Sequence, residues 1–269
     1  MKIAVITLSL RGHEIAERIR DGFYGADLYV HDSVDIPAGS RPVERFAKIV
    51  ELTETVFHRY EGLVYVAPCG VAVRAIAGSL GEKTTDPAVV VLDAGARFAV
   101  SLLSGHEGGA NELAVRIANL TAAEPVISTT TEAMKNVIVG VGCRKGTGQA
   151  RVKEAIVAAL GEAGVSLDEV RFVATADVKA EETGLIEAAA GLGIPLRIVP
   201  SDLIRTYAGA FQASRFVMEK VNLPAVAEPA AMLAGRRTRL LRGKKSYHGV
   251  TVALARESFM SSGSARAAD

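Results

Sequence analysis

The sequence predicts an α/β protein of two domains, each made of alternating strands and helices around a largely parallel or mixed sheet, with a cleft between them. Two observations predict this architecture. Apolar runs typical of strands alternate with segments of helical periodicity along most of the 269 residues. A polar stretch with a threonine cluster, residues 128–137, interrupts the alternation, and the pattern then restarts. We therefore predict domains at 1–131 and 137–256, a short linker at 132–136 and a disordered tail at 257–269.

Strands and helices alternate through the first half of the chain. Apolar runs predict strands at residues 2–8, 27–31, 62–67, 88–92, 97–103 and 125–128. Helical spacing predicts helices at residues 13–21, 42–59, near 70–78 and from Glu112 to Leu120. In the longest of them, the side chains expected toward the core are Val43, Phe46, Ala47, Val50 and Val56. Asp93 to Ala96 reads as a hairpin turn. This alternation predicts a largely parallel sheet with helices on both faces.

The second half repeats the pattern. Strands are predicted at residues 137–141, 170–175, 195–199, 238–242 and 249–255. Helices are predicted at about 149–161 and 180–190, and near 201–207, 214–221 and 227–234. Residues 243–248, which contain Lys244 and Lys245, read as an exposed connection between the last two strands.

Composition excludes several classes of protein. Hydrophobic residues make up 49% of the chain, which excludes a mainly disordered protein. A net charge of +1 gives no general attraction to nucleic acid or to a membrane surface, and the absence of tryptophan argues against a stacking platform for single-stranded nucleic acid. The first residues read as a strand, so we expect a cytoplasmic protein. Cys69 and Cys143 form no zinc pattern and are expected to be reduced, with Cys69 as a buried thiol.

The segment 104–111, Ser-Gly-His-Glu-Gly-Gly-Ala-Asn, carries the strongest functional signal. It joins a predicted strand to a predicted helix, where free N–H groups and the helix dipole favour an anion. Its glycines allow the backbone to approach a ligand closely. His106 could transfer protons near neutral pH, although a structural hydrogen bond is the alternative reading of any single histidine. Asn111 could bind either a ligand or the backbone of the turn.

Other turns offer further candidates, because ligands of open parallel sheets bind beyond the carboxyl ends of strands. Ala67 to Gly70, with Arg74 one turn later, follows one strand, and Ser128 to Thr131 follows another. Asp86-Pro87 reads as a turn. In the second half, Gly140 to Gly146 resembles an anion cradle without the ending of a P-loop. Its Arg144 and Lys145 suit carboxylates, or are solvated residues of a helix-opening turn.

Lys179, Glu181 and Glu182 lie at the start of a predicted helix. They read as a solvated face of that helix, which is the usual setting of charged residues at such positions.

Together these motifs resemble the CbiG family, the cobalt-precorrin-5A hydrolases of anaerobic cobalamin biosynthesis. The similar segments are residues 67–70, Arg74, Lys83, 86–90, 102–114, 125–131, 139–146, Lys179 with Glu182, 226–231 and 249–253. Longer members carry a middle segment between the two halves that is absent at residues 131–137. The second half is also similar to a single-domain tetrapyrrole protein of the aerobic pathway.

The resemblance implies a hydrolase. Water would open the δ-lactone of cobalt-precorrin-5A, and acetaldehyde would leave to give cobalt-precorrin-5B. Cobalt belongs to the substrate, so neither a cofactor nor a protein-bound metal is expected. The expected partner is the corrinoid, with no nucleic acid or membrane; a homodimer and contacts with neighbouring pathway enzymes stay open. A non-catalytic corrinoid carrier is the alternative function.

Specific residues are assigned on this basis. The predicted catalytic residues are His106, as general base or acid, and Ser104. Backbone N–H groups of Gly108 and Gly109 are expected to stabilise the lactone oxyanion. The predicted substrate-binding residues are Gly70, Arg74, Lys83, Gly105, Gly108, Gly109, Asn111, Thr129, Thr130, Gly142, Arg144, Lys145 and Gly146.

Overall fold

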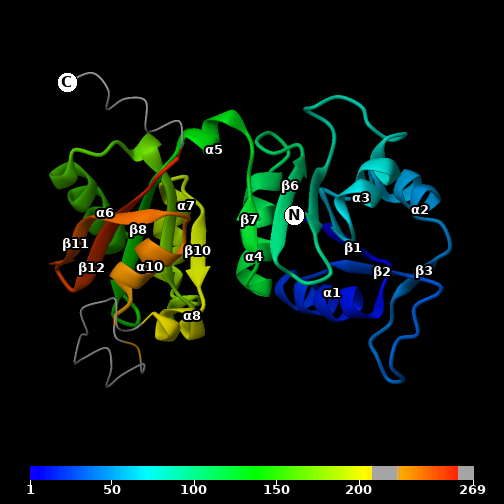
Figure 1. Cartoon of the computed structure of the whole chain (residues 1–269), viewed down its shortest axis with the longest axis horizontal. Helices are drawn as coiled ribbons and strands as arrows, with labels where there is room; N and C mark the ends of the chain where they lie inside the picture. The colour runs from blue at the N-terminus through cyan, green and yellow to red at the C-terminus, as the bar shows by residue number, and fades with distance from the viewer. Residues whose placement is uncertain (208–222, 224, 260–269) are drawn as a thin grey trace. The chain divides into compact units, whose positions relative to one another are not determined.

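The computed structural model describes residues 1–207, 223 and 225–259 (Figure 1). The chain forms two compact units, Met1–Thr129 and Thr130–Asp269. Where a linker was expected, a short helix, α5 (Thr130–Met134), begins the second unit. Each unit is an α/β structure around its own mixed sheet, which confirms the predicted fold class.

The first unit contains a seven-stranded sheet in the order β3-β2-β1-β4-β5-β6-β7. Its strands are β1 (Ile3–Thr7), β2 (Asp27–His31), β3 (Glu44–Phe46), β4 (Gly62–Val66), β5 (Ala88–Leu92), β6 (Phe98–Leu103) and β7 (Glu124–Val126). Neighbouring strands are parallel except β5 and β6. Helices α1 (Leu10–Gly22) and α4 (Ala110–Thr121) pack on one face, and α2 (Ile49–Val56) and α3 (Cys69–Ile76) on the other.

The predicted helix at 42–59 is wrong, because two elements occupy this segment. Phe46 is buried and pairs with His31 as part of β3, at the edge of the sheet. The helix α2 starts only at Ile49, and Val50 is exposed rather than in the core. Pairing with β2 therefore overrides the local helical periodicity.

The hairpin between β5 and β6 reverses the direction of the chain, as predicted. The Asp93 carboxylate accepts the N–H groups of Gly95, Arg97 and Phe98 at 2.8–2.9 Å, which fixes the turn. Leu103, at the end of β6, pairs with Val89 near the start of β5. The segment that follows β6 therefore lies at the end of the sheet where strands β4 and β5 begin.

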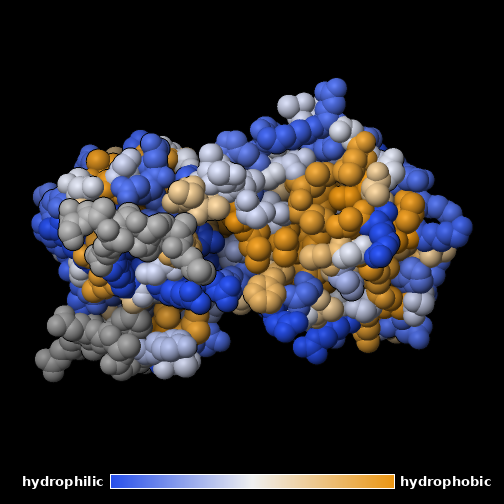
Figure 2. Space-filling view, turned by 45° about the horizontal axis from the view of Figure 1, so that its top comes forward, coloured by the Kyte–Doolittle hydropathy of each residue, from blue (hydrophilic) through white to orange (hydrophobic). Residues whose placement is uncertain are grey.

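Hydrophobic side chains also reach the surface of the first unit, as Figure 2 shows on its right. Phe98 of β6 and Val126 of β7 are 39% and 38% exposed. Leu102 and Leu103 are half-buried and immediately precede the turn at 104–109. Leu102 and Leu103 thus place apolar surface at the end of β6.

The second unit has a five-stranded sheet in the order β10-β9-β8-β12-β11. Strands β8 (Val137–Cys143), β9 (Val170–Ala176) and β10 (Leu196–Val199) are parallel, and β12 (Val250–Glu257) runs antiparallel between β8 and β11 (Thr238–Tyr247). Its longer helices are α6 (Gln149–Ala163), α7 (Thr183–Gly191), α8 (Ser201–Thr206) and α10 (Ala227–Leu233). The predicted helix near 214–221 and residues 260–269 of the predicted tail lie outside the described residues.

The predicted connection at 243–248 is wrong. Strand β11 continues to Tyr247, and the chain turns at His248 and Gly249. Lys245 pairs with Val252 in the sheet, and its ammonium group contacts Glu162 at 2.8 Å. Pairing with β12 extends the strand through a polar sequence that resembles a loop.

No helix among the described residues is both long enough and apolar enough to cross a membrane.

The buried side chain of Glu257 allows a test of what stabilises the second unit. This side chain accepts two hydrogen bonds from Arg171 at 2.7–2.8 Å. We expect Glu257→Gln to lower the free energy of unfolding by about 3 kcal/mol, because the change leaves the Arg171 charge without its carboxylate. Urea unfolding followed by circular dichroism measures this. The control is Glu169→Gln, since the Glu169–Arg256 pair is only partly buried, with side chains 41% and 30% exposed, and should contribute less than about 1 kcal/mol. Equal effects of the two changes would contradict the expectation.

Candidate active site

The turn between β6 and α4 has a backbone shape that its sequence specifies. Ser104 and Gly109 adopt positive φ angles of 55° and 83°. Their carbonyl groups and that of Gly105 accept N–H groups from the first turns of α4, among them Ala110 to Ser104 at 3.1 Å and Asn111 to Gly105 at 2.9 Å. The turn is therefore fastened to the helix that it opens.

Asn111 holds this turn in place from inside. Its side chain is only 8% exposed, accepts a hydrogen bond from Ser101 Oγ at 2.8 Å and donates one to Thr129 Oγ1 at 2.9 Å. Of the two readings of Asn111, the structural one fits these contacts, although its partners are side chains rather than the backbone of the turn. The hydroxyl of Thr129 is thus bound to Asn111, whereas Thr130 is exposed at the start of α5.

Close packing explains two of the glycines. A Cβ atom on Gly105 would lie 2.7 Å from Thr129 Cγ2, and one on Gly108 would lie 2.4 Å from Ser104 Cβ. Real Cβ atoms do not approach their neighbours so closely. Gly105 and Gly108 are therefore required by the fold of the turn, whether or not a ligand binds beside them.

Four polar groups of this turn have no partner among the described residues. The N–H groups of Gly108 and Gly109 donate to no acceptor there. The imidazole of His106 is exposed and forms no hydrogen bond with that part of the chain. Ser104 Oγ is also unpartnered but buried, so it does not face a ligand in this conformation. The free amides and His106 remain as groups that can act on a bound molecule.

Lys83 reaches the same turn but is not free. Its ammonium group lies 2.8 Å from Glu107 Oε1, and this hydrogen bond is the main cause of the lowered pKa of Glu107. The side chains of Lys83 and Glu107 are 75% and 39% exposed, so the pair contributes little to stability. A substrate carboxylate at Lys83 would have to compete with Glu107.

The structure does not bring Gly70 and Arg74 to the turn around His106. They belong to α3, which follows the carboxyl end of β4, and Arg74 Nη1 donates to Gly70 O at 3.2 Å. Because β6 is antiparallel to β5, β6 finishes at the opposite end of the strands from the carboxyl end of β4. The two ends are separated by about 17 Å, the length of a five-residue strand. Cys69 is exposed at the start of α3, so the expectation of a buried thiol is wrong.

The glycine turn of the second unit rests on a partly buried ion pair. Glu182 accepts the N–H of Gly146 at 3.0 Å and the ammonium group of Lys179 at 3.0 Å. Burial alone would raise the pKa of Glu182, but these two hydrogen bonds together with the positive charges of Lys179 and Lys145 outweigh it, and the pKa is lowered. The expectation of a solvated face at Lys179 and Glu182 is wrong, since both side chains are about 85% buried.

Sequence reasoning thus missed the structural role of Glu182 and of Ser101. Only the spacing of Lys179 and Glu182, three residues apart, gave a signal that the two could pair. A Cβ atom on Gly142 would lie 3.4 Å from Val226 Cβ, just before α10 begins. Burial raises the pKa of the Cys143 thiol beside it.

Arg144 and Lys145 are exposed on this turn, and neither side chain forms a hydrogen bond or ion pair with a described residue. A charge-assisted hydrogen bond from a guanidinium contributes about 1.5–3 kcal/mol. We therefore expect Arg144→Ala to weaken corrinoid binding roughly 10- to 150-fold and to change turnover at saturating substrate much less. Titration followed by visible absorption measures the affinity. Arg151→Ala, an exposed arginine of α6, is the matched control, and equal affinities of the two variants would return Arg144 to the solvated reading.

The fold and these turns define a class of protein: two α/β units, each with a glycine-rich turn that joins a strand to a helix. Residues 51–132 match the family described as Cobalamin synthesis G N-terminal, and residues 137–255 match Cobalamin synthesis G C-terminus. The chain belongs to the CbiG family.

Three relatives illustrate the similarity. A cobalt-precorrin-5A hydrolase of Priestia megaterium is 24% identical over 364 aligned positions, which cover 94% of each protein. The cobalt-precorrin-5A hydrolase of Salmonella typhimurium is 45% identical over 76 residues, 28% of this chain and 22% of that protein. Protein CobE of Sinorhizobium is 31% identical over 128 residues, 47% of this chain and 83% of that protein. The first alignment is longer than the 269 residues of this chain, so that relative contains residues without a counterpart here.

Proposed function

We propose that this chain is a cobalt-precorrin-5A hydrolase, which opens the lactone of a cobalt-bearing corrinoid with water and releases acetaldehyde. The proposal is supported by family membership and by the relative in Priestia megaterium that aligns with 94% of the chain. The observation that carries it is the turn at 104–109. There, the unpaired N–H groups of Gly108 and Gly109 lie next in sequence to the exposed imidazole of His106.

The chemistry follows from these groups. His106 takes a proton from water as the water oxygen bonds to the lactone carbonyl carbon. The carbonyl oxygen gains negative charge, and the N–H groups of Gly108 and Gly109 stabilise it. The acyl C–O bond of the lactone then breaks, and the proton returns to the leaving oxygen, which becomes a hydroxyl group. This hydroxyl then loses its proton as the C–C bond between its carbon and the macrocycle breaks. The electron pair of that bond stays on the macrocycle, which takes up a proton, and the two-carbon unit departs as acetaldehyde. Half-buried Leu102 and Leu103 offer an apolar surface to the macrocycle beside this turn.

Ser104 has a different place in this proposal from the one first assigned to it. Its Oγ is buried, so the hydroxyl does not reach a lactone in this conformation. Its backbone, with φ of 55° and a carbonyl that accepts the Ala110 N–H, shapes the turn. Ser104 is therefore a positioning residue, and His106 is the catalytic one.

One observation favours the rival function, a corrinoid carrier without catalysis. No described side chain forms a hydrogen bond to His106, whereas a general base is commonly oriented by a second group. Incubation of the purified protein with cobalt-precorrin-5A decides between the two functions. Stoichiometric acetaldehyde release above the uncatalysed rate supports the hydrolase. Tight corrinoid binding without acetaldehyde would replace it with the carrier.

The proposed reaction needs only substrate and water, with cobalt supplied by the substrate. We expect protein treated with a chelator and then desalted to retain its full rate of acetaldehyde release on cobalt-loaded substrate. Untreated protein is the control. A loss of rate that added zinc restores would contradict this expectation.

A further inference from the structure

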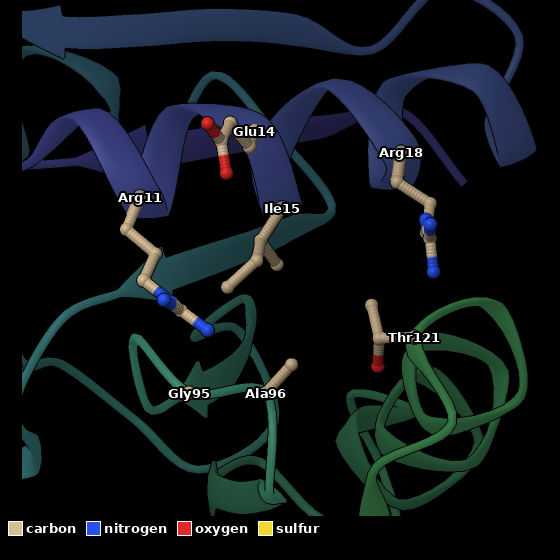
Figure 3. A pocket seen from close by; sticks show the side chains of 7 residues that line it. All are labelled: Arg11, Glu14, Ile15, Arg18, Gly95, Ala96 and Thr121. Carbon is tan, nitrogen blue, oxygen red and sulfur yellow. The ribbon is translucent and has the colours of Figure 1, made fainter.

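A hollow of about 210 Å³ lies on the first unit, outside the turn at 104–111. Its lining residues are Arg11, Glu14, Ile15, Arg18, Gly95, Ala96 and Thr121. Figure 3 shows Arg11, Ile15 and Arg18 extending from α1 toward the tip of the β5–β6 hairpin and the end of α4. The hairpin tip and the turn around His106 lie at the two ends of β6, about 20 Å apart for six residues.

The two arginines of this hollow are available to a ligand. The guanidinium groups of Arg11 and Arg18 form no hydrogen bond or ion pair with a described residue. Glu14 lies three residues after Arg11 and four before Arg18, a spacing at which helical ion pairs form, yet it pairs with neither. On the same helix, Arg20 is paired with Glu17. The unpaired guanidinium groups are thus a property of this face of α1.

The chemistry and the spacing of the two arginines define which kind of ligand fits the hollow. Arg11 and Arg18 are seven residues apart, which is about 10 Å along the helix axis. Each guanidinium can hold one carboxylate through two parallel hydrogen bonds. Ile15 lies between them in sequence on the same helix face, and Ala96 faces it from the hairpin, so the middle of the hollow is apolar.

We propose that this hollow binds a molecule with two carboxylates joined by an apolar segment. Two sources have this chemistry: a free aliphatic dicarboxylate, or the rim of the corrinoid substrate with two of its carboxylate side chains. The second source rests on the proposed function, whereas the first does not.

Calorimetry with suberate, an aliphatic dicarboxylate, tests the site without any corrinoid. We expect suberate to bind the full-length protein, hexanoate to bind more weakly, and Arg11→Gln or Arg18→Gln each to weaken suberate binding about 10-fold or more. Arg59→Gln is the matched control and should leave the affinity unchanged. Arg59 is an exposed arginine on the other side of the sheet, and its side chain has no partner among the described residues. Thermal unfolding without ligand checks that the variants fold.

A second titration, with the cobalt-corrinoid, separates the two sources. Weaker corrinoid binding by the Arg11→Gln/Arg18→Gln double variant assigns the hollow to the rim of the substrate, even if acetaldehyde release fails. Weaker suberate binding alone assigns it to a free dicarboxylate. If the double variant binds both suberate and corrinoid as the unchanged protein does, or if suberate does not bind and corrinoid affinity is unaltered, the proposal is overturned.

Discussion

The variant His106→Ala is expected to lower the rate of acetaldehyde release about 10²–10⁴-fold, the usual contribution of a general acid or base. The side chain is exposed and holds no described residue in place, so the fold should not change. Corrinoid affinity should change little, because proton transfer acts in the transition state rather than in binding. Release at saturating substrate gives the rate, and titration by visible absorption gives the affinity.

The matched control is His58→Ala, since His58 is also an exposed histidine of the first unit and lies outside the turn. It should keep the full rate. If a folded His106→Ala protein released acetaldehyde at a near-normal rate, His106 would have no part in the mechanism. The carrier function would remain only if the unchanged protein also lacked activity.

Local periodicity was sufficient to predict most elements of both sheets. The predicted strands at 27–31 and 88–92 match β2 and β5 in both bounds. Apolar runs of this kind identify strands well because such strands are buried on both faces of the sheet. The errors at 42–59 and 243–248 arose where an edge strand is short or polar, and where only pairing with a neighbour reveals it.

Strand direction, rather than strand position, limited the prediction of the site. The hairpin at Asp93 was predicted, and it implies that β6 runs against β5. The candidate site residues were nevertheless placed as if every strand had its carboxyl end at the same end of the sheet. Gly70 and Arg74 therefore lie apart from His106, whereas Lys83 and Thr129, which precede β5 and follow β7, lie beside its turn.

Side-chain partners could not be predicted from the sequence. The motif indicated that Asn111 and the glycines matter, but not that Asn111 joins Ser101 to Thr129. The glycines were interpreted as positions where the backbone can approach a ligand closely. Close packing inside the turn already excludes a Cβ atom at Gly105 and Gly108. A sequence specifies which residues can adopt a turn, and packing decides what they touch.

Gly108 provides the second test with a large expected effect. A Cβ atom there would lie 2.4 Å from Ser104 Cβ, 3.0 Å from the Ser104 carbonyl oxygen and 3.2 Å from that of Asp86. Because none of these atoms is the far end of a flexible side chain, Gly108→Ala must shift the turn itself. The N–H groups of Gly108 and Gly109 would then leave the positions proposed for the oxyanion.

We expect Gly108→Ala to lower turnover roughly 100-fold or more, which is the usual cost of losing one oxyanion donor. Gly78→Ala is the control in the same unit, because its nearest atom would be Glu54 Oε1 at an ordinary 3.7 Å. Turnover and the thermal unfolding midpoint are measured for both variants. A folded Gly108→Ala protein with the rate of Gly78→Ala would show that the backbone of this turn does not stabilise the transition state. A lowered rate together with unchanged corrinoid affinity would place its contribution in the chemical step, since uniform binding does not accelerate that step.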